Sequence, residues 1–231
     1  MNRRVVTVAG YDILFQFRNG FYLIYLIISA LYIGILFSIP ESHRLLVTYA
    51  LVFSDTSILG LTFVGALLLL EKQQNILSSL FVTPLHVRDY LAGKVISLSL
   101  LALWASLAIL VIPNGWIDSS VFVISGILLG SSFFILLGIA VGARVSSMNG
   151  FIFGIMASTV IFALPLLGYF KVYDAWWLYL LPTRATLLLF ESSLRPLSTS
   201  ELVYAFATLL VWNVLGARLA VWSFHKFILE R

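Results

Sequence analysis

The sequence predicts an all-α polytopic membrane protein with six transmembrane helices. Of its 231 residues, 61% are hydrophobic and only 10% are charged, whereas a soluble domain carries about 25% charged residues. The mean hydropathy is +1.05, and several uncharged windows have the roughly 20 residues that cross a bilayer core. This composition excludes a soluble enzyme, a disordered chain and a nucleic-acid-binding domain.

Residues 1–19 are too polar to span a membrane and too apolar to form a free tail. Basic residues alternate there with apolar ones, so we expect an amphipathic helix that lies in the bilayer interface. A partly helical tail is the alternative interpretation. Asp12 and Arg18 interrupt the apolar stretch, so we do not expect a cleaved signal peptide.

Six apolar segments are expected to cross the bilayer, and they cover about 20–39, 47–70, 95–112, 120–142, 150–167 and 201–222. The Pro113-Asn114-Gly115 turn closes the third segment. Ser198 and Glu201 have the spacing of a capping box at the start of the sixth. Loop 71–94 and loop 168–200 are the longest connections, and the whole chain, 1–231, forms a single membrane domain.

The basic residues predict the orientation. One side of the membrane receives nine lysines and arginines and the other receives four, so both termini are expected in the cytoplasm. The first set is Arg3, Arg4, Arg18, Lys72, Arg88, Lys94, Arg144, Lys226 and Arg231, and the second is Arg44, Lys171, Arg184 and Arg195. Arg218 lies inside the sixth segment and can snorkel to the cytoplasmic face.

Asp55 is the one acidic residue well inside an apolar segment, and two interpretations stay open. It can be a functional charge within the membrane. Alternatively it is a helix N-cap whose carboxylate accepts from the backbone N–H of Ser57 or Ile58. The cluster Ser54-Asp55-Thr56-Ser57 favours the cap, because these side chains compete for local backbone hydrogen bonds.

Motifs for chemistry within the chain are missing. The sequence contains no GxxxxGK[ST], HExxH or GxSxG pattern, and its three histidines fall in loops or at a helix end. Cysteine is absent, which excludes thiolate metal sites and a cysteine nucleophile. We therefore expect no catalytic residue, no metal site and no cofactor in this chain.

Small residues recur at four-residue spacing in two segments. The fourth segment carries Gly126, Gly130, Gly138 and Gly142, and the fifth carries Gly150 and Gly154. This spacing places them on one helix face, where backbones can approach closely. Packing within the chain is expected for the fourth segment, and a contact between subunits is the alternative.

The loop 71–94 contains a short amphipathic helix. Asn75 can adopt a turn conformation, and Ile76, Leu77, Leu80 and Phe81 follow at helical spacing. Thr83-Pro84 ends the helix, because the residue before a proline disfavours helical backbone. Such a helix either rests on the bilayer or docks into a groove on a cytoplasmic partner.

The segment LLEKQQNILSSLFVTPLHVRDYLAGK resembles the loop between the second and third spans of ABC-2 type transporter permeases. Ten residues match that pattern: Glu71, Lys72, Leu77, Leu80, Thr83, Pro84, Leu85, Tyr90, Leu91 and Lys94. The segments DILFQFRNGFYLIYL and FSDTSILG are similar to the fluoroquinolone-type exporter branch. Gln73 stands where the family has an acidic residue, and Asn75 and Ile76 replace its usual Gly-Thr.

The resemblance implies partners and an energy source. Such permeases pair as homodimers or heterodimers in a prokaryotic cell membrane, and each binds a separate ABC ATPase that holds ATP and Mg. Helix 75–84 would be the coupling helix and residues 1–19 the connecting helix of the docking surface. The coupling residues would be Glu71, Asn75, Leu77, Leu80, Phe81, Thr83 and Pro84. The permease contact would follow the first and fifth spans, with Gly150 and Gly154 on its surface.

The function expected from this resemblance is outward transport of an amphipathic small molecule, drug or lipid-like substrate. A substrate-capture subunit of a vitamin importer is the alternative within transport; it would bind its ligand tightly alone and lack the Thr-Pro-Leu loop. A membrane scaffold without transport is the alternative from another class.

Overall fold

A computed structural model describes residues 3–83, 85–115, 120–145, 147–170, 172–173 and 175–229. Within these ranges every regular element is a helix, which confirms the predicted all-α class. In chain order the elements are α1 (Arg3–Arg18), α2 (Phe21–Phe37), α3 (Glu41–Ser54), the π-helical η1 (Asp55–Leu59), α4 (Gly60–Gln73), α5 (Ile76–Phe81), α6 (Val87–Asn114), α7 (Ser120–Arg144), α8 (Met148–Ala163), α9 (Pro165–Tyr169), the 3-10 helix η2 (Trp176–Leu180), α10 (Pro182–Glu191), α11 (Thr199–Phe224) and the π-helical η3 (His225–Leu229).

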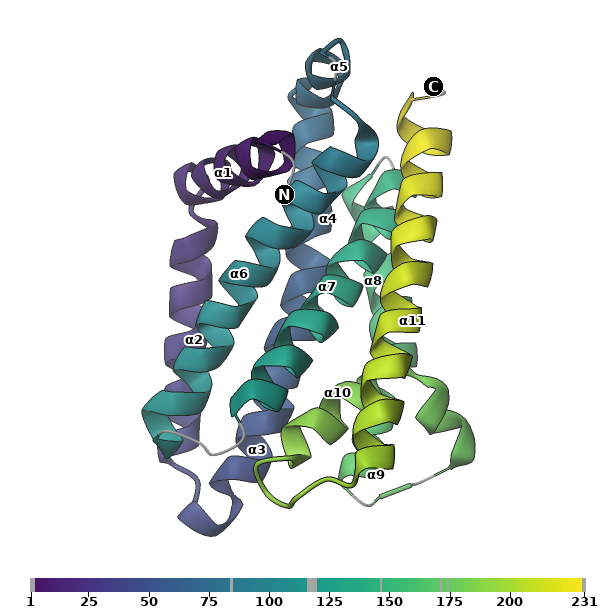
Figure 1. Ribbon diagram of the computed structural model, residues 1–231. Helices are drawn as coiled ribbons and strands as arrows, with labels where there is room; N and C mark the ends of the chain where they lie inside the picture. The colour runs from purple at the N-terminus through teal and green to yellow at the C-terminus, as the bar shows by residue number, and fades with distance from the viewer. Residues whose placement is uncertain are drawn as a thin grey trace.

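Five helical segments of the described chain are long and apolar enough to cross a membrane. They are Glu41–Gln73, Val87–Asn114, Val121–Arg144, Met148–Tyr169 and Thr199–Leu229. The pair α1–α2, bent by 69°, supplies a sixth candidate. Helix α2 runs along the bundle, and α1 lies across its end (Figure 1), as an interfacial helix would.

The two ends of the bundle differ. Helices α1 and α5 and the C-terminus lie at one end, and the start of α3, α9 and α10 lie at the other (Figure 1). We call these the α5 end and the α10 end. The common position of both termini agrees with an even number of crossings.

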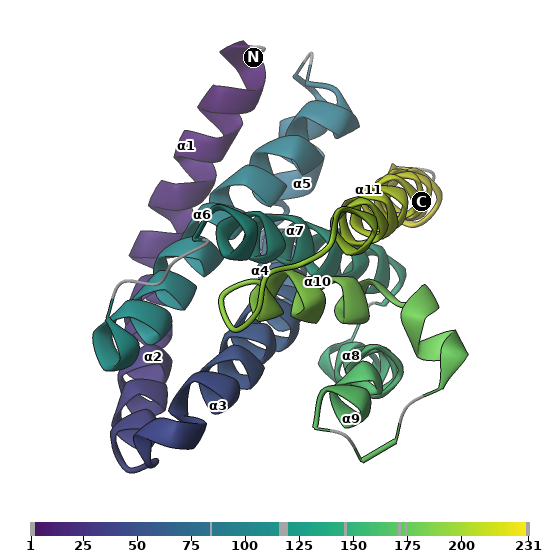
Figure 2. The same ribbon diagram turned by 60° about the horizontal axis from the view of Figure 1, so that its bottom comes forward.

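Helix α7 is the centre of the fold. It packs against α4, α6, α10 and α11, and these helices lie around it when the α10 end is turned toward the viewer (Figure 2). A Cβ atom at Gly138 would lie 2.4 Å from Val64 Cγ1 and 2.6 Å from the Leu61 carbonyl oxygen. The prediction that the fourth-segment glycines pack within the chain is therefore confirmed, because the missing side chain lets α4 and α7 approach.

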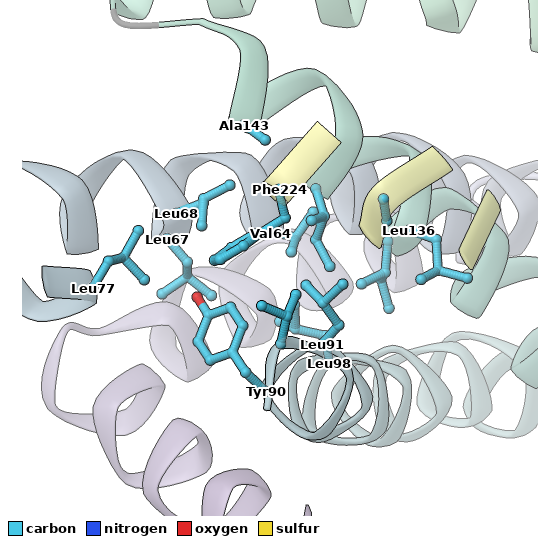
Figure 3. Close-up of a cluster of buried hydrophobic side chains, with 14 residues drawn as sticks. Val64, Leu67, Leu68, Leu77, Tyr90, Leu91, Leu98, Leu136, Ala143 and Phe224 are labelled. Carbon is cyan, nitrogen blue, oxygen red and sulfur yellow. The ribbon is translucent and has the colours of Figure 1, made fainter. Parts of the chain in front are cut away.

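The largest buried cluster lies toward the α5 end. Figure 3 shows Val64 and Leu68 of α4 meeting Tyr90 of α6 and Phe224 of α11. Leu77 of α5 and Leu136 of α7 complete the same cluster. The short helix α5 is thus attached to the bundle core and does not hang from it as a free loop.

Helix α10 departs from the sequence expectation, which treated 168–200 as a loop. Residues 182–190 form a mostly buried helix against α7 and α11. Pro182 starts it at a position where a missing N–H costs nothing. The capping box predicted for Ser198 and Glu201 is present at the start of α11, and Arg195 donates to both Glu191 and Glu201, which ties α10 to α11.

We expect Gly138→Ala to destabilise the protein, because the added Cβ would overlap the backbone of α4. Overpacking of this kind costs about 1–3 kcal/mol. Gly34→Ala in α2 is the matched control, since nothing lies within 4 Å of its Cβ position. Thermal melting in detergent compares the two variants, and equal midpoints would contradict the close α4–α7 contact.

Candidate functional site

The short helix α5 begins at a strained backbone position. Asn75 has φ of 54° and is the single non-glycine residue with a positive φ in the described ranges. Asparagine tolerates this left-handed conformation better than most residues, so Asn75 can replace the family's glycine. The predicted turn and helix are both present, and the helix covers Ile76–Phe81.

The apolar side of α5 faces the bundle core. Leu77 is buried, and Leu80 and Phe81 pack against the core cluster. The Phe81 ring lies 5.4 Å from the Phe224 ring and 5.8 Å from the Tyr90 ring, between centroids. These three predicted coupling residues therefore anchor α5 on the core, and their part in coupling to an ATPase stays a prediction.

Other residues cover the outer surface of α5 and the turn after it. Ser79 and Thr83 are exposed, and the Val82 side chain is 89% exposed. Of the predicted coupling residues, Thr83 lies on this outer surface, whereas Pro84 lies outside the described residues. An apolar side chain as exposed as Val82 at a helix tip is available for contact with another protein.

A buried lysine connects three helices beneath α5. Lys94 of α6 is fully buried, and its Nζ lies 2.8 Å from Asp12 Oδ1 of α1 and 2.8 Å from Glu71 Oε1 of α4. The two carboxylate side chains are only 5% and 8% exposed. Charges buried in this way persist when they are paired and hydrogen-bonded.

Neutral polar groups complete this cluster. The Tyr90 hydroxyl donates to Glu71 Oε2, and the Ser97 hydroxyl donates to Asp12 Oδ2. Gln16 Nε2 donates to Asp12 Oδ2 at 2.7 Å and to Ser97 Oγ at 3.1 Å. We call these six residues, Asp12, Gln16, Glu71, Tyr90, Lys94 and Ser97, the Lys94 network.

Close backbone packing holds α1 in place beside the network. A Cβ atom at Gly93 would lie 2.5 Å from Val8 Cγ1 and 3.2 Å from the Ala9 backbone nitrogen. Glycine therefore lets α1 lie directly on α6, one residue before Lys94. Together, the close packing at Gly93 and the Lys94 network fix α1 against α4 and α6.

The sequence interpretation of this region missed the network. Glu71 was a predicted site residue, whereas Asp12 was taken only as a break in the apolar stretch of residues 1–19. Lys94 was counted as a cytoplasmic charge and as a match to the loop pattern, without a partner. The sequence does show that each pair shares a helix face, because Asp12 and Gln16 are four residues apart and Lys94 and Ser97 are three apart. Their meeting depends on tertiary packing, which no spacing rule supplies.

A cleft opens between α1 and α5 at this end of the bundle. It has a volume of about 540 Å³, with Tyr11 and Phe15 of α1 on one wall and Gln74 and Leu80 on the other. Asp12, Glu71 and Tyr90 line its floor. Ile76 and Leu80 of α5 line this cleft together with the three network residues.

A second basic residue fixes the ends of α4 and α7. Lys72 Nζ donates to the carbonyl oxygens of Gly142, Ala143 and Val145, at 3.0, 2.9 and 3.1 Å. A cation at a helix C-terminus satisfies its free carbonyls and complements the helix dipole. The α5 end is therefore held by polar contacts as well as by apolar packing.

Asp55 does not cap a helix. Its φ and ψ of −61° and −52° are helical, and Glu41–Gln73 is one continuous helical segment, so the favoured cap interpretation is wrong. Ser106 Oγ donates to Asp55 Oδ2 at 3.4 Å, while Oδ1 is buried without a hydrogen-bond partner. The π-helical turn η1 starts at this residue, and such turns are frequent at functional positions.

Gly150 and Gly154 face their own chain. A Cβ atom at Gly154 would lie 2.7 Å from Val141 Cγ1 of α7, and one at Gly150 would meet Ser147 and Val145. This packing places Gly154 against α7 of the same chain, and the contact of these glycines with a second permease stays a prediction. The outward side of α8 instead carries Phe153, Met156 and Val160, which are 59–73% exposed.

Comparison with known proteins identifies the family. The sequence matches the Fluoroquinolones export permease protein family over residues 3–231. The chain belongs to this family. A fluoroquinolones export permease protein of Mycobacterium tuberculosis strain CDC 1551 / Oshkosh is 24% identical over 231 residues, covering 99% of this chain and 98% of the relative. The protein of the same description from strain ATCC 25618 / H37Rv gives the same values.

Membership of the fluoroquinolones export permease family confirms the ABC-2-like resemblance and makes the chain a multi-pass transport permease, a transporter subunit and not an enzyme. The Lys94 network and the α5 turn are consequently features of a transport protein. Their contribution to transport depends on what the α5 end contacts.

We expect Lys94→Met to destabilise the α5 end, because it leaves the Asp12 and Glu71 carboxylates buried without a counter-charge. Breaking a buried ion pair costs about 3–5 kcal/mol. Lys226→Met, at an exposed lysine, is the matched control. Thermal melting and protease cleavage of α1 report the change, and the triple variant Asp12→Asn/Glu71→Gln/Lys94→Met should recover stability. Wild-type behaviour of Lys94→Met would contradict the network.

For Asp55→Asn we expect a thermal midpoint at or above that of the wild type. The amide keeps the shape of the side chain and removes a buried charge that no described basic residue pairs with; an unsatisfied buried group costs about 1–3 kcal/mol. A lower midpoint would show that the charge stabilises the fold. An export assay on the same variant separates a packing position, which keeps export, from a transport charge, which loses it.

Proposed function

We propose that this chain is the membrane-spanning subunit of an ATP-driven exporter whose α5 end binds a separate ABC ATPase. The observation that supports this proposal most is the Lys94 network, which joins α1 to α4 and α6 at the same end of the bundle where α5 is followed by the exposed Val82. The cleft between α1 and α5 adds a concave surface, to which α5 contributes Ile76 and Leu80. A knob beside a groove is a common arrangement for docking another protein.

The same contacts suggest how force enters the membrane domain. Movement of a bound ATPase would push on α5, and Leu77, Leu80 and Phe81 would carry that push into the core cluster. The Lys94 network would make α1 move with α4 and α6. In this proposal the chain transmits motion, while ATP and Mg belong to the partner.

The proposed orientation puts the α5 end in the cytoplasm of a prokaryotic cell. The excess of lysines and arginines on that side supports it. The two relatives from Mycobacterium tuberculosis are named fluoroquinolones export permease proteins, which supports outward transport of an amphipathic small molecule by this chain.

Pairing with a second permease, identical or related, forms part of the proposal. The sequence has no ATP-binding motif of its own, so we expect a larger assembly. Helices α2 and α8 keep large apolar side chains on their outer sides. In α2 these include Leu23, Leu26 and Leu31, each 59–63% exposed. Such faces contact either lipid or a second subunit.

We expect Val82→Asp to abolish co-purification with the ATPase while the chain keeps its thermal midpoint. A charge in the centre of a docking contact must be desolvated when the partner binds. The Val82 side chain is 89% exposed in this chain, so the substitution removes little packing from the fold. Val172→Asp, at a valine 72% exposed near the opposite end, is the matched control and should retain the ATPase. Retention by both variants would refute docking through α5, and tight ligand binding without any ATPase would favour an importer subunit.

Cysteine crosslinking tests the pairing, because the chain has no native cysteine. We expect oxidation to give dimers from Leu26→Cys in α2 and Met156→Cys in α8. Val211→Cys in α11, also exposed, is the control and should stay monomeric. Crosslinks confined to the α11 position would contradict the proposed interface.

A further inference from the structure

A second cavity lies on the opposite side of the bundle from α8. It is a groove of about 620 Å³ between α6, α7 and α11, the three helices that form the near face in Figure 1. Leu91, Val95 and Ile96 of α6 form one wall, and Ala217, Val221 and Trp222 of α11 form the other. Leu136 of α7 lies at its floor.

Two arginines give this apolar groove its charge. Arg88 of α6 and Arg218 of α11 both line it and are both exposed. Neither takes part in an ion pair or hydrogen bond within the described chain, and none of the groove's lining residues is acidic. Arg144 and Lys226 lie nearby but are directed to the Trp222 ring, at 5.3 and 5.0 Å from its centroid.

The groove has charged residues at one end and apolar residues along its length, as a phospholipid has a charged headgroup and an apolar chain. Residues 88, 91, 92, 95 and 96 share one face of α6, so the apolar wall extends about 12 Å deeper into the bundle than Arg88. Two unpaired guanidinium groups favour a phosphate, which they can bind through paired hydrogen bonds. The apolar wall below them favours an acyl chain over water.

We propose that this groove binds an anionic phospholipid, with its headgroup phosphate at Arg88 and Arg218 and an acyl chain along α6 and α11. A second copy of this chain is a poorer occupant of the groove, because its own unpaired arginines would repel Arg88 and Arg218. Helices α2 and α8 also carry larger exposed apolar faces, which suit pairing better. The proposal rests on membrane insertion alone and does not depend on an ATPase partner.

The test is a titration of the full-length chain in detergent, followed by native mass spectrometry. The probes are phosphatidylglycerol and phosphatidylcholine with the same palmitoyl and oleoyl chains. We expect phosphatidylglycerol to bind more tightly, and Arg88→Gln/Arg218→Gln to weaken it about 30-fold, since each basic group contributes about fivefold. Arg88→Lys/Arg218→Lys should stay within about threefold of the wild type, with an unchanged gel-filtration profile in both variants.

Two controls separate a site from general surface charge. Arg3→Gln/Arg18→Gln removes the same charge from exposed positions of α1 and should leave the affinity nearly unchanged. Ala92→Phe fills the groove without changing charge and should displace the lipid. Equal affinity for the two lipids, equal weakening by the α1 variant, or wild-type binding by Ala92→Phe would each overturn the proposal, as would displacement by the free headgroup glycerophosphoglycerol.

Discussion

The arrangement of this permease depends on one buried lysine. Lys94 has no access to water, so its charge must be balanced inside the protein, and Asp12 and Glu71 supply that balance from two other helices. An unpaired ammonium in such a position would cost several kcal/mol. The position of α1 is therefore fixed by an electrostatic requirement, in addition to the apolar contacts that an interfacial helix makes with lipid.

The remaining helices are held by close backbone contact. Within a bilayer, apolar side chains gain little by leaving lipid for protein, so helices associate through packing and hydrogen bonds. Gly138 brings α4 and α7 together, and Lys72 joins the ends of the same two helices. The α5 end thus combines a polar network with tight packing, as the proposed contact with an ATPase would require.

Local rules predicted much of this fold. The Asn75 turn and the Ser198–Glu201 capping box depend on residues near one another in sequence, and both are present. The apolar segments are helical as predicted, with five candidate spans and a sixth in the bent pair α1–α2. Helix α10 was missed because it is too short to span and is buried by its neighbours. Asp55 was misplaced because Ser54, Thr56 and Ser57 favour a cap locally, whereas tertiary packing keeps the helix continuous.

The candidate site was predicted less completely, because its contacts join distant parts of the chain. Lys94 is 82 residues from Asp12 and 23 from Glu71, and no spacing pattern brings them together. Helical periodicity identified Phe81 as part of an apolar face but could not tell whether that face meets its own core or a partner. The same ambiguity affected Gly154, which packs on Val141 of its own chain.

The central claim is that the Lys94 network joins α1 to α4 and α6, and that α5, which is anchored on the same core through Leu77 and Phe81, moves with them when the proposed ATPase binds nucleotide. Spin labels at Gly10→Cys and Ser79→Cys, both at exposed positions, allow pulsed electron-resonance measurement of the α1–α5 distance in the assembled transporter. The account predicts one narrow distance distribution that is the same without nucleotide and with ATP, and that broadens when Lys94→Met is added. A wild-type distance that changes by several ångströms between the two nucleotide states would contradict it.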